Sequence, residues 1–167
     1  MNGAKKGRKS VSTQELTTIP KKSIIPKLIG WGIPVLLLGL FVYGFFTKGK
    51  DFSKETIWIW FLVNGILSAV GAAIALAHPL TILSAFLGAP ITSLNPLIAA
   101  GWVAGLVQAF VKKPTVDDME DLPNAIYSVK GFWTNPVSRI LLVVIFANLG
   151  SVLGTWISGL WIVARSV

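Results

Sequence analysis

The sequence contains no cysteine and only one histidine, His78. Disulfides, thiolate chemistry and the histidine-rich sites typical of zinc are therefore excluded. The uncharged stretches of the chain carry no carboxylate, no Ser-Lys pair and no His-metal arrangement, so an intramembrane enzyme is the weakest class of function. We expect no catalytic residue, no metal site and no cofactor.

Charged residues are absent from three long stretches of the chain. Only 13% of the residues are charged, and 53% are hydrophobic. Because the hydrocarbon core of a bilayer is about 30 Å thick, one helix needs roughly 20 apolar residues to cross it. The sequence therefore predicts an all-α membrane protein, with a single polytopic domain at residues 25–167 and the lipid bilayer as its main partner. The stretches without Asp, Glu, Lys or Arg are Leu28 to Thr47, Thr56 to Val111 and Ile140 to Ala164.

The middle stretch is 56 residues long, which is too long for one crossing and awkward for two. Its latter part contains Pro79, Pro90 and Pro96. Each proline removes a backbone donor and disfavours helix at the preceding residue. We therefore predict a full helix followed by a re-entrant hairpin of two half-helices, the first ending before Pro90 and the second starting at Pro96 with Asn95 as its N-cap.

The expected fold has three full transmembrane helices, this Pro-broken re-entrant helical hairpin and a short amphipathic surface helix. The hairpin is favoured over a further complete crossing because it places eleven basic residues on one side of the membrane and four on the other. In the surface helix we expect Thr115 as N-cap, Asp118 in the first turn and Pro123 at the end. The expected bounds are 25–46, 53–77 and 136–163 for the transmembrane helices, 79–89 and 96–111 for the half-helices, and 115–130 for the surface segment.

Residues 1–24 form a basic tail that we predict to be disordered. The first 27 residues contain seven basic residues and a single acid, Glu15. By the positive-inside rule the N-terminus faces the cytoplasm, so we expect a multi-pass protein of a prokaryotic plasma membrane. We expect no nucleic-acid partner, because no aromatic residue is interleaved with these charges.

Small residues recur at helical spacing in the uncharged stretches. They predict tight helix packing, because helices in lipid approach one another closely over glycine and alanine. The same faces make a homo-oligomer a further possibility. The expected packing residues are Gly71, Gly101, Gly105, Gly150, Gly154 and Ser158.

Several polar side chains lie within the uncharged stretches, and they have two interpretations. Either they hydrogen bond between helices and cap the hairpin, or they line a solute or ion site at the hairpin turn, where the positive end of a helix dipole points. Asn64, Gln108 and Asn148 are candidates for a shared interior network. The possible polar membrane site comprises Asn64, His78, Thr92, Ser93, Asn95, Gln108 and Asn148.

Three strings of the chain are specific: HPLT begins at His78, APITSLNP at Ala89 and NLGS at Asn148. From about Ile19 to its end, the sequence closely resembles the C-terminal membrane region of the TraB family, also called pheromone shutdown proteins. Family members usually carry an N-terminal soluble domain related to proposed metal-dependent proteases, whose Gly-His and Glu-His motifs have no counterpart here. The resemblance thus implies a membrane module without hydrolase chemistry of its own.

Two functions remain open at this point. The resemblance implies a membrane module that anchors and regulates a partner domain, and that domain binds or inactivates a peptide signal. The re-entrant hairpin would instead suit a channel or transporter, with the polar side chains lining the path. The family commonly has Glu at the position of Gln108, so a role that depends on a carboxylate does not carry over to this chain.

Overall fold

The computed structural model describes residues 25–95 and 98–166, and the predicted disorder of residues 1–24 lies outside them. All regular structure in the described residues is helical, which confirms the predicted all-α class. The helices are α1 (Ile25–Lys48), α2 (Lys50–Ile74), α3 (Pro79–Ser93), α4 (Ala100–Val111), α5 (Val116–Glu120), α6 (Leu122–Ala125), α7 (Val129–Thr134) and α8 (Pro136–Ser166).

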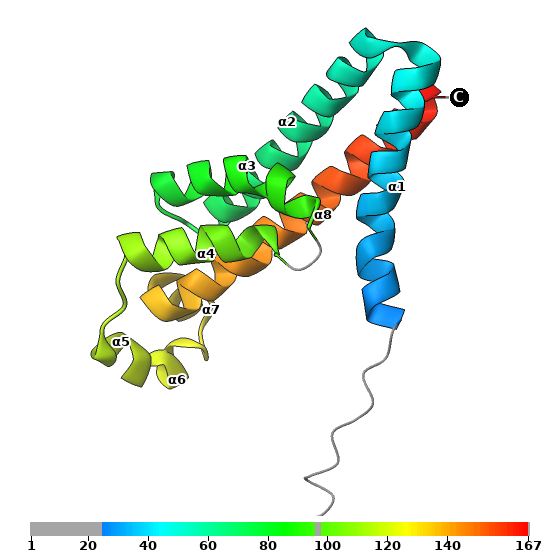
Figure 1. Cartoon of the computed structure of the whole chain (residues 1–167). Coiled ribbons are helices and arrows are strands. Elements are labelled where there is room, and N and C mark those ends of the chain that lie inside the picture. The colour runs from blue at the N-terminus through cyan, green and yellow to red at the C-terminus, as the bar shows by residue number, and fades with distance from the viewer. Residues whose placement is uncertain (1–24, 96–97, 167) are drawn as a thin grey trace, which may run out of the picture.

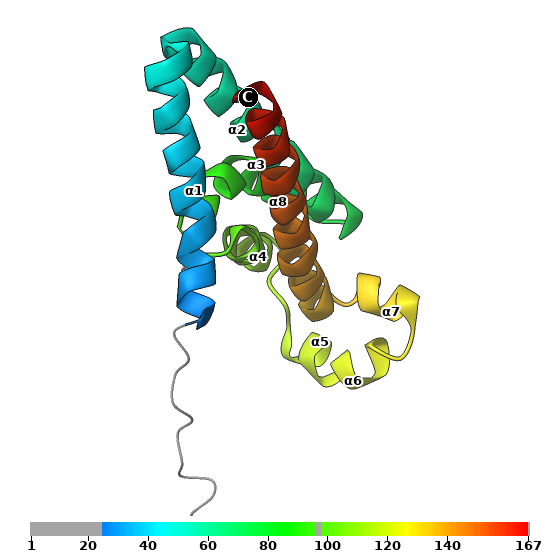
Figure 2. The ribbon, with the colours of Figure 1, turned by 90° about the vertical axis from the view of Figure 1, so that its right-hand side faces the viewer.

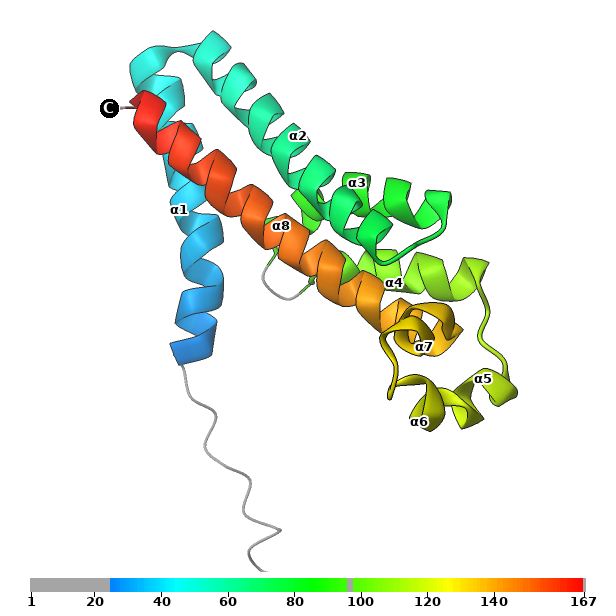
Figure 3. The ribbon, with the colours of Figure 1, turned by 180° about the vertical axis from the view of Figure 1, so that it is seen from behind.

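The long helices α2 and α8 lie side by side and run in opposite directions (Figures 1 and 3). The shorter helices α3 and α4 form an antiparallel hairpin that packs across this pair (Figure 2). Helix α1 lies on the same side of the pair, near the turn of the hairpin (Figures 2 and 3). The three small helices α5 to α7 gather at the end where α8 begins. The hairpin therefore starts and finishes at the same end of the bundle, and its re-entrant character in a membrane stays a prediction.

Two of the described helices are long and apolar enough to cross a membrane, as judged from length and composition. They are Lys50–Ile74 and Pro136–Arg165. Helix α1 has 24 residues and contains Pro34. Three full crossings were expected from the sequence. Two of them correspond to described helices that are long and apolar enough to cross a membrane, and the third stays a prediction.

The connection between α1 and α2 is shorter than predicted. The sequence suggested a polar loop between residues 46 and 53, but α1 continues to Lys48 and α2 begins at Lys50, so that only Gly49 separates them. Gly49 has a φ of 89°, which glycine adopts without steric cost. Lys48 in the last turn of α1 and Asp51 in the first turn of α2 match the helix dipoles, so these charged residues favour helix here.

Helix α3 does not end before Pro90, and this prediction was wrong. Pro90 is buried inside the helix, which continues to Ser93. A proline in a helix interior leaves the carbonyl four residues earlier without its usual donor. That carbonyl belongs to Phe86 and lies against Gly65 of α2, where an added Cβ would be only 2.6 Å from the oxygen. Packing against α2 therefore holds the helix past its proline.

The second half of the hairpin also begins later than predicted. Helix α4 starts at Ala100 rather than at 96, and Ala99 in the N-cap position makes no side-chain hydrogen bond to it. The Asn95 carbonyl instead accepts a hydrogen bond from the Ile98 amide at 3.1 Å. The first turn of α4 is capped from α8, because the Gly101 amide donates to Asn148 Oδ1 at 2.7 Å. The predicted N-cap role of Asn95 is thus filled by a residue distant in sequence.

The surface segment is divided into three short helices rather than one. Thr115 caps α5 through a capping box with Asp118, as predicted. Pro123, however, lies in the first turn of α6 and does not end the segment. Asn135 then starts α8, and its side-chain amide donates to the Asp118 carbonyl at 2.8 Å, which ties α5 to the first turn of α8.

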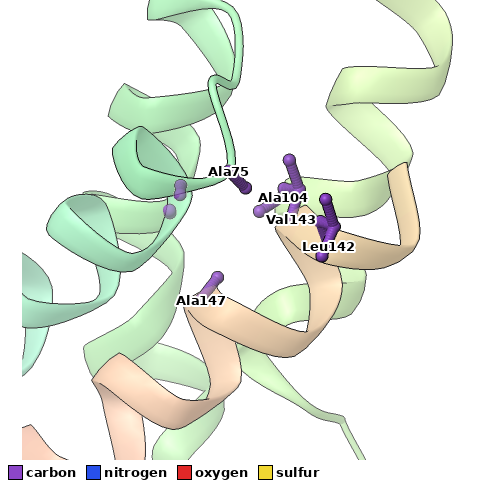
Figure 4. Close-up of a cluster of buried hydrophobic side chains, with 7 residues drawn as sticks. Ala75, Ala104, Leu142, Val143 and Ala147 are labelled. Atoms are coloured by element: carbon purple, nitrogen blue, oxygen red, sulfur yellow. The ribbon is translucent and has the colours of Figure 1, made fainter. Parts of the chain in front are cut away.

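The interior of the bundle is built mainly from alanine. The buried cluster between α2, α3, α4 and α8 is Ala72, Ala75, Ala85, Ala104, Leu142, Val143 and Ala147, most of which are labelled in Figure 4. Small side chains let helix backbones approach closely, and the energy of such contacts is dispersion summed over many atoms. This close packing fixes the positions of the polar side chains described next.

Candidate functional site

The interface between α2 and α8 is a direct backbone contact made at glycines. A Cβ on Gly71 would collide with the carbonyl of Phe146, and one on Gly150 with the carbonyl of Leu67. A Cβ on Gly154 would lie 2.6 Å from the Cα of Asn64. These three glycines therefore set the distance between the two helices.

Helix α4 meets α8 in the same way. A Cβ on Gly101 would collide with the Val144 carbonyl, and one on Gly105 with the Val144 side chain. Ser158 is buried, but its hydroxyl donates to the Gly154 carbonyl of its own helix at 2.6 Å. The structure thus places the five glycines singled out from the sequence at helix contacts, whereas the hydrogen bond of Ser158 stays within α8.

Asn64 is the centre of a buried hydrogen-bond cluster. Its side chain is fully buried, and its amide nitrogen donates to Ser93 at 3.1 Å and to Thr155 at 2.8 Å. Its amide oxygen accepts from Ser151 at 3.0 Å, and the hydroxyls of Ser93 and Ser151 lie 2.9 Å apart. We call these four residues the Asn64 cluster. It joins α2, α3 and α8 at one point.

Gln108 belongs to a second and separate cluster at the start of the hairpin. Its side-chain oxygen accepts from the Thr81 hydroxyl at 2.8 Å and from the His78 amide at 3.0 Å. The His78 ring nitrogen Nδ1 accepts from the Leu80 amide at 3.3 Å, so this histidine is the N-cap of α3. The His78 and Gln108 pair therefore fixes where the first half of the hairpin begins.

The predicted common network of Asn64, Gln108 and Asn148 is not what the structure shows. Asn64 and Gln108 bond to different partners, and Asn148 bonds to the Gly101 amide of α4. The reason is geometric. Each amide satisfies backbone or hydroxyl groups where a helix begins or where two helices cross, so that each has its own partners.

Six polar residues do meet at one place, around a cavity of about 310 Å³ between α1, α8 and the segment that joins α3 to α4. Four of them belong to the polar site predicted from the sequence, whereas Ser151 and Thr155 were predicted to share a helix face with Asn148 but were not assigned to that site. These two stand three and seven residues after Asn148, on the same face of α8, and that helical spacing is the signal that links them to the site. The six are Thr92, Ser93, Asn95, Asn148, Ser151 and Thr155.

Thr92 and Ser93 also complete the last turn of α3. The Thr92 hydroxyl donates to the Gly88 carbonyl at 2.9 Å, and the Ser93 hydroxyl to the Ala89 carbonyl at 2.7 Å. These acceptors lie four residues earlier in the same helix and also accept from its backbone amides, so the two bonds satisfy the hydroxyls within α3 and do not cap the end of the half-helix. Of the two residues, Ser93 also joins the Asn64 cluster.

An electrostatic feature outside the long helices is the capping box of α5. The Thr115 backbone amide and hydroxyl both donate to the Asp118 carboxylate at 2.8 Å, and these bonds lower the pKa of Asp118. Within the described residues, no group of three or more His, Cys, Asp or Glu side chains is arranged to hold a metal ion. The Asp118 carboxylate thus acts on the first turn of its own helix.

Comparison with known proteins identifies the chain. The family model described as "TraB family protein, C-terminal domain" matches residues 25–167. The chain belongs to the TraB family. It is also 34% identical over 151 residues to a TraB relative, the uncharacterized protein MJ1365 of Methanocaldococcus jannaschii. That alignment covers 87% of this chain and 38% of MJ1365, so this TraB chain spans well under half the length of its relative. No solved structure matches the chain.

Proposed function

We propose that this chain is the membrane module of a TraB-like protein. It anchors and regulates, at a prokaryotic plasma membrane, a domain that binds or inactivates a peptide signal. The family match and the greater length of MJ1365 support the idea of a partner domain. The anchoring role rests on one structural observation, which is the distribution of apolar side chains.

Large apolar side chains point away from the bundle on every long helix. Exposed fractions are 62% for Leu36 on α1, 63% for Trp58 on α2, 61% for Leu106 on α4 and 66% for Leu160 on α8. The interior holds mainly alanine, glycine, serine and fully buried Asn64, with few large apolar side chains such as Leu142 and Ile162. A protein in water buries its large apolar residues and rarely exposes a continuous apolar surface. This inverted arrangement is what a lipid solvent favours.

In the proposed orientation α1, α2 and α8 cross the bilayer, and the α3–α4 hairpin enters and leaves from the side that carries α5 to α7. The basic residues support this side as cytoplasmic. Lys112, Lys113 and Lys130 lie there, whereas Lys50 and Lys54 lie at the opposite end near the α1–α2 junction. The N-terminus then faces the cytoplasm.

The absence of cysteine makes this orientation testable with single-cysteine variants. Lys50→Cys and Asn124→Cys are placed at exposed positions at opposite ends of the bundle. Cells expressing each variant are treated with a membrane-impermeant maleimide before and after permeabilisation. We expect Cys at position 50 to react in intact cells and Cys at position 124 only after permeabilisation. Labelling of both positions in intact cells, or release of the chain by alkaline carbonate, would contradict the proposal.

The anchoring of a partner domain needs its own experiment. The part of MJ1365 that this chain does not cover is expressed with and without the chain, and its share in the membrane fraction is measured. Recruitment that depends on the chain is expected. An equal share in both preparations would leave the chain as a membrane protein without an anchoring role.

A further inference from the structure

The cavity next to the Asn64 cluster has features that helix packing does not require. It has a volume of about 310 Å³, and its walls come from α1, the end of α3, the start of α4 and α8. One water molecule occupies about 30 Å³ in the liquid, so the cavity has room for about ten waters or one small solute. Polar wall residues distinguish it from the apolar cavity of similar volume between α1 and α8.

The cavity lies beside the interruption between the two half-helices. Ser151, which contributes to its wall, is close to the middle of α8 (Pro136–Ser166), so a membrane-spanning α8 would place the cavity near the bilayer centre. Non-helical backbone at that depth is stable only when it is buried in protein or lines a water-filled space. Here Asn95, Ile98 and Ala99, which join the two half-helices, contribute to the cavity wall. The cavity thus provides the surroundings that non-helical backbone between the two half-helices needs at this depth.

Half of the described wall residues are apolar, and Ile98, Val152 and Trp156 are exposed, so the cavity is open on that side. The polar groups of the wall are hydroxyls and amides. Among the described residues that line the cavity, none is Asp, Glu, Lys, Arg or His. A charged side chain would offset the cost of moving an ion from water to this depth, and the described wall does not supply one. The chemistry therefore favours an uncharged molecule that can both donate and accept hydrogen bonds.

Two wall residues retain hydrogen-bonding capacity for such a molecule. The Thr155 hydroxyl accepts from Asn64 Nδ2, and its own hydrogen makes no bond within the described residues. Asn148 uses its oxygen to cap α4, and its Nδ2 group makes no hydrogen bond to the described part of the chain. A solute hydroxyl oxygen is an acceptor for both donors.

We propose that this cavity is hydrated and binds one small, uncharged, hydroxyl-bearing solute. The inference rests on the proposed membrane function, because the polar groups of the wall distinguish a polar solute from lipid only when the bundle lies in a bilayer. It extends that function from anchoring to recognition of a solute within the membrane domain. The Asn64 cluster then serves as a preorganised wall, because its hydroxyls are already held in place by hydrogen bonds.

The test uses single cysteines in the purified chain reconstituted into lipid vesicles. Ala99→Cys places a thiol in the cavity wall, and the matched control Leu106→Cys places one on the lipid-facing side of α4. Reaction with a hydrophilic methanethiosulfonate needs water to form the thiolate, so position 99 should react on the order of tenfold faster than position 106. Glycerol should slow the reaction at position 99 severalfold, while a polyethylene glycol too large to enter the cavity should not. Val152→Cys, which lines the same cavity from α8, replaces Ala99→Cys if the latter does not fold.

Each other outcome overturns a defined part of the proposal. A position 99 as unreactive as position 106 shows a dry cavity and overturns the inference alone. Reaction at position 99 that glycerol does not slow shows water without a solute site, and it overturns the binding claim. Rapid reaction at position 106 shows that the exposed face of α4 is in water, which overturns the membrane function and the inference together.

Discussion

Helix α8 packs against α2 and against α1 in two different ways. Against α2 the contact is between backbones, and Gly71 and Gly150 have no room for a Cβ. Against α1 the contact is looser, because an apolar cavity of about 300 Å³ lies between the helices and a Cβ on Gly32 or Gly159 would meet no atom within 4 Å. A glycine in an apolar helix can thus either be required for close packing or face open space, and the position of the neighbouring helix determines which.

The contrast suggests how the molecule is organised. The Asn64 cluster and the alanine core join α2, α3, α4 and α8 into one tightly packed unit. Helix α1 is held by its junction with α2 and by a smaller cluster of Leu37, Trp60 and Ile162. We therefore regard α1 as the helix that can shift at the lowest cost, and the solute cavity borders it through Pro34.

The largest expected effect is that of Gly150→Val. The new side chain would collide with the backbone of Leu67 and Ser68, which cannot move without separating α2 from α8. We expect a loss of about 3 kcal/mol or more of unfolding free energy, measured by denaturation in detergent micelles. Gly159→Val, nine residues further along the same helix and facing open space, is the control and should have little effect. Equal losses in both variants would remove the distinction between the two interfaces.

The next effect is that of Asn64→Leu, which deletes the centre of the cluster. Ser151 loses its acceptor and Thr155 its donor in a buried environment. Hydrogen bonds between helices in lipid contribute about 0.6 kcal/mol on average and up to about 1.7, so we expect a loss near 2 kcal/mol. Ser158→Ala, whose hydroxyl bonds only within α8, should cost much less. A neutral Asn64→Leu would show that the cluster does not hold the helices together.

A substitution in α1, the loosely packed helix, is expected to increase stability. Gly39 on α1 faces open space, so Gly39→Ala meets no steric obstacle. Alanine favours helix over glycine by up to about 1 kcal/mol, and the variant should be more stable by part of that amount in the same denaturation assay. A loss of stability would indicate that a partner packs on Gly39 in the membrane.

The smallest effect concerns pH and lies outside the bundle. Because hydrogen bonds from Thr115 lower the pKa of Asp118 in the folded state, the capping box contributes stability above the unfolded pKa of about 3.9 and loses it as the pH falls through the lower folded pKa. We expect the protection factor of the Met119 amide against hydrogen exchange to fall in that acidic range, and Asp118→Asn to abolish this fall. A protection factor that does not change with pH in the unmodified chain would contradict the role of the carboxylate.

Local signals predicted local features well. Thr115 and Asp118 form the capping box that their spacing indicated, and Asn135 followed by Pro136 starts α8. Pro90 was misread because a proline removes one hydrogen bond, and packing of α3 on α2 outweighs that loss. Asn148 was recognised as a polar residue within an apolar helix, but its task of capping α4 depends on a contact with Gly101, 47 residues away in the chain.

The helical class, the uncharged lengths that suit a bilayer, the family and the small faces of the helices all follow from the sequence alone, because they depend on composition and on spacing along one helix. The tertiary structure was needed to show which glycines are indispensable, where the hairpin turns, and which polar residues share a cavity. Those outcomes depend on how closely two helices approach, and that distance is set jointly by side chains far apart in the sequence.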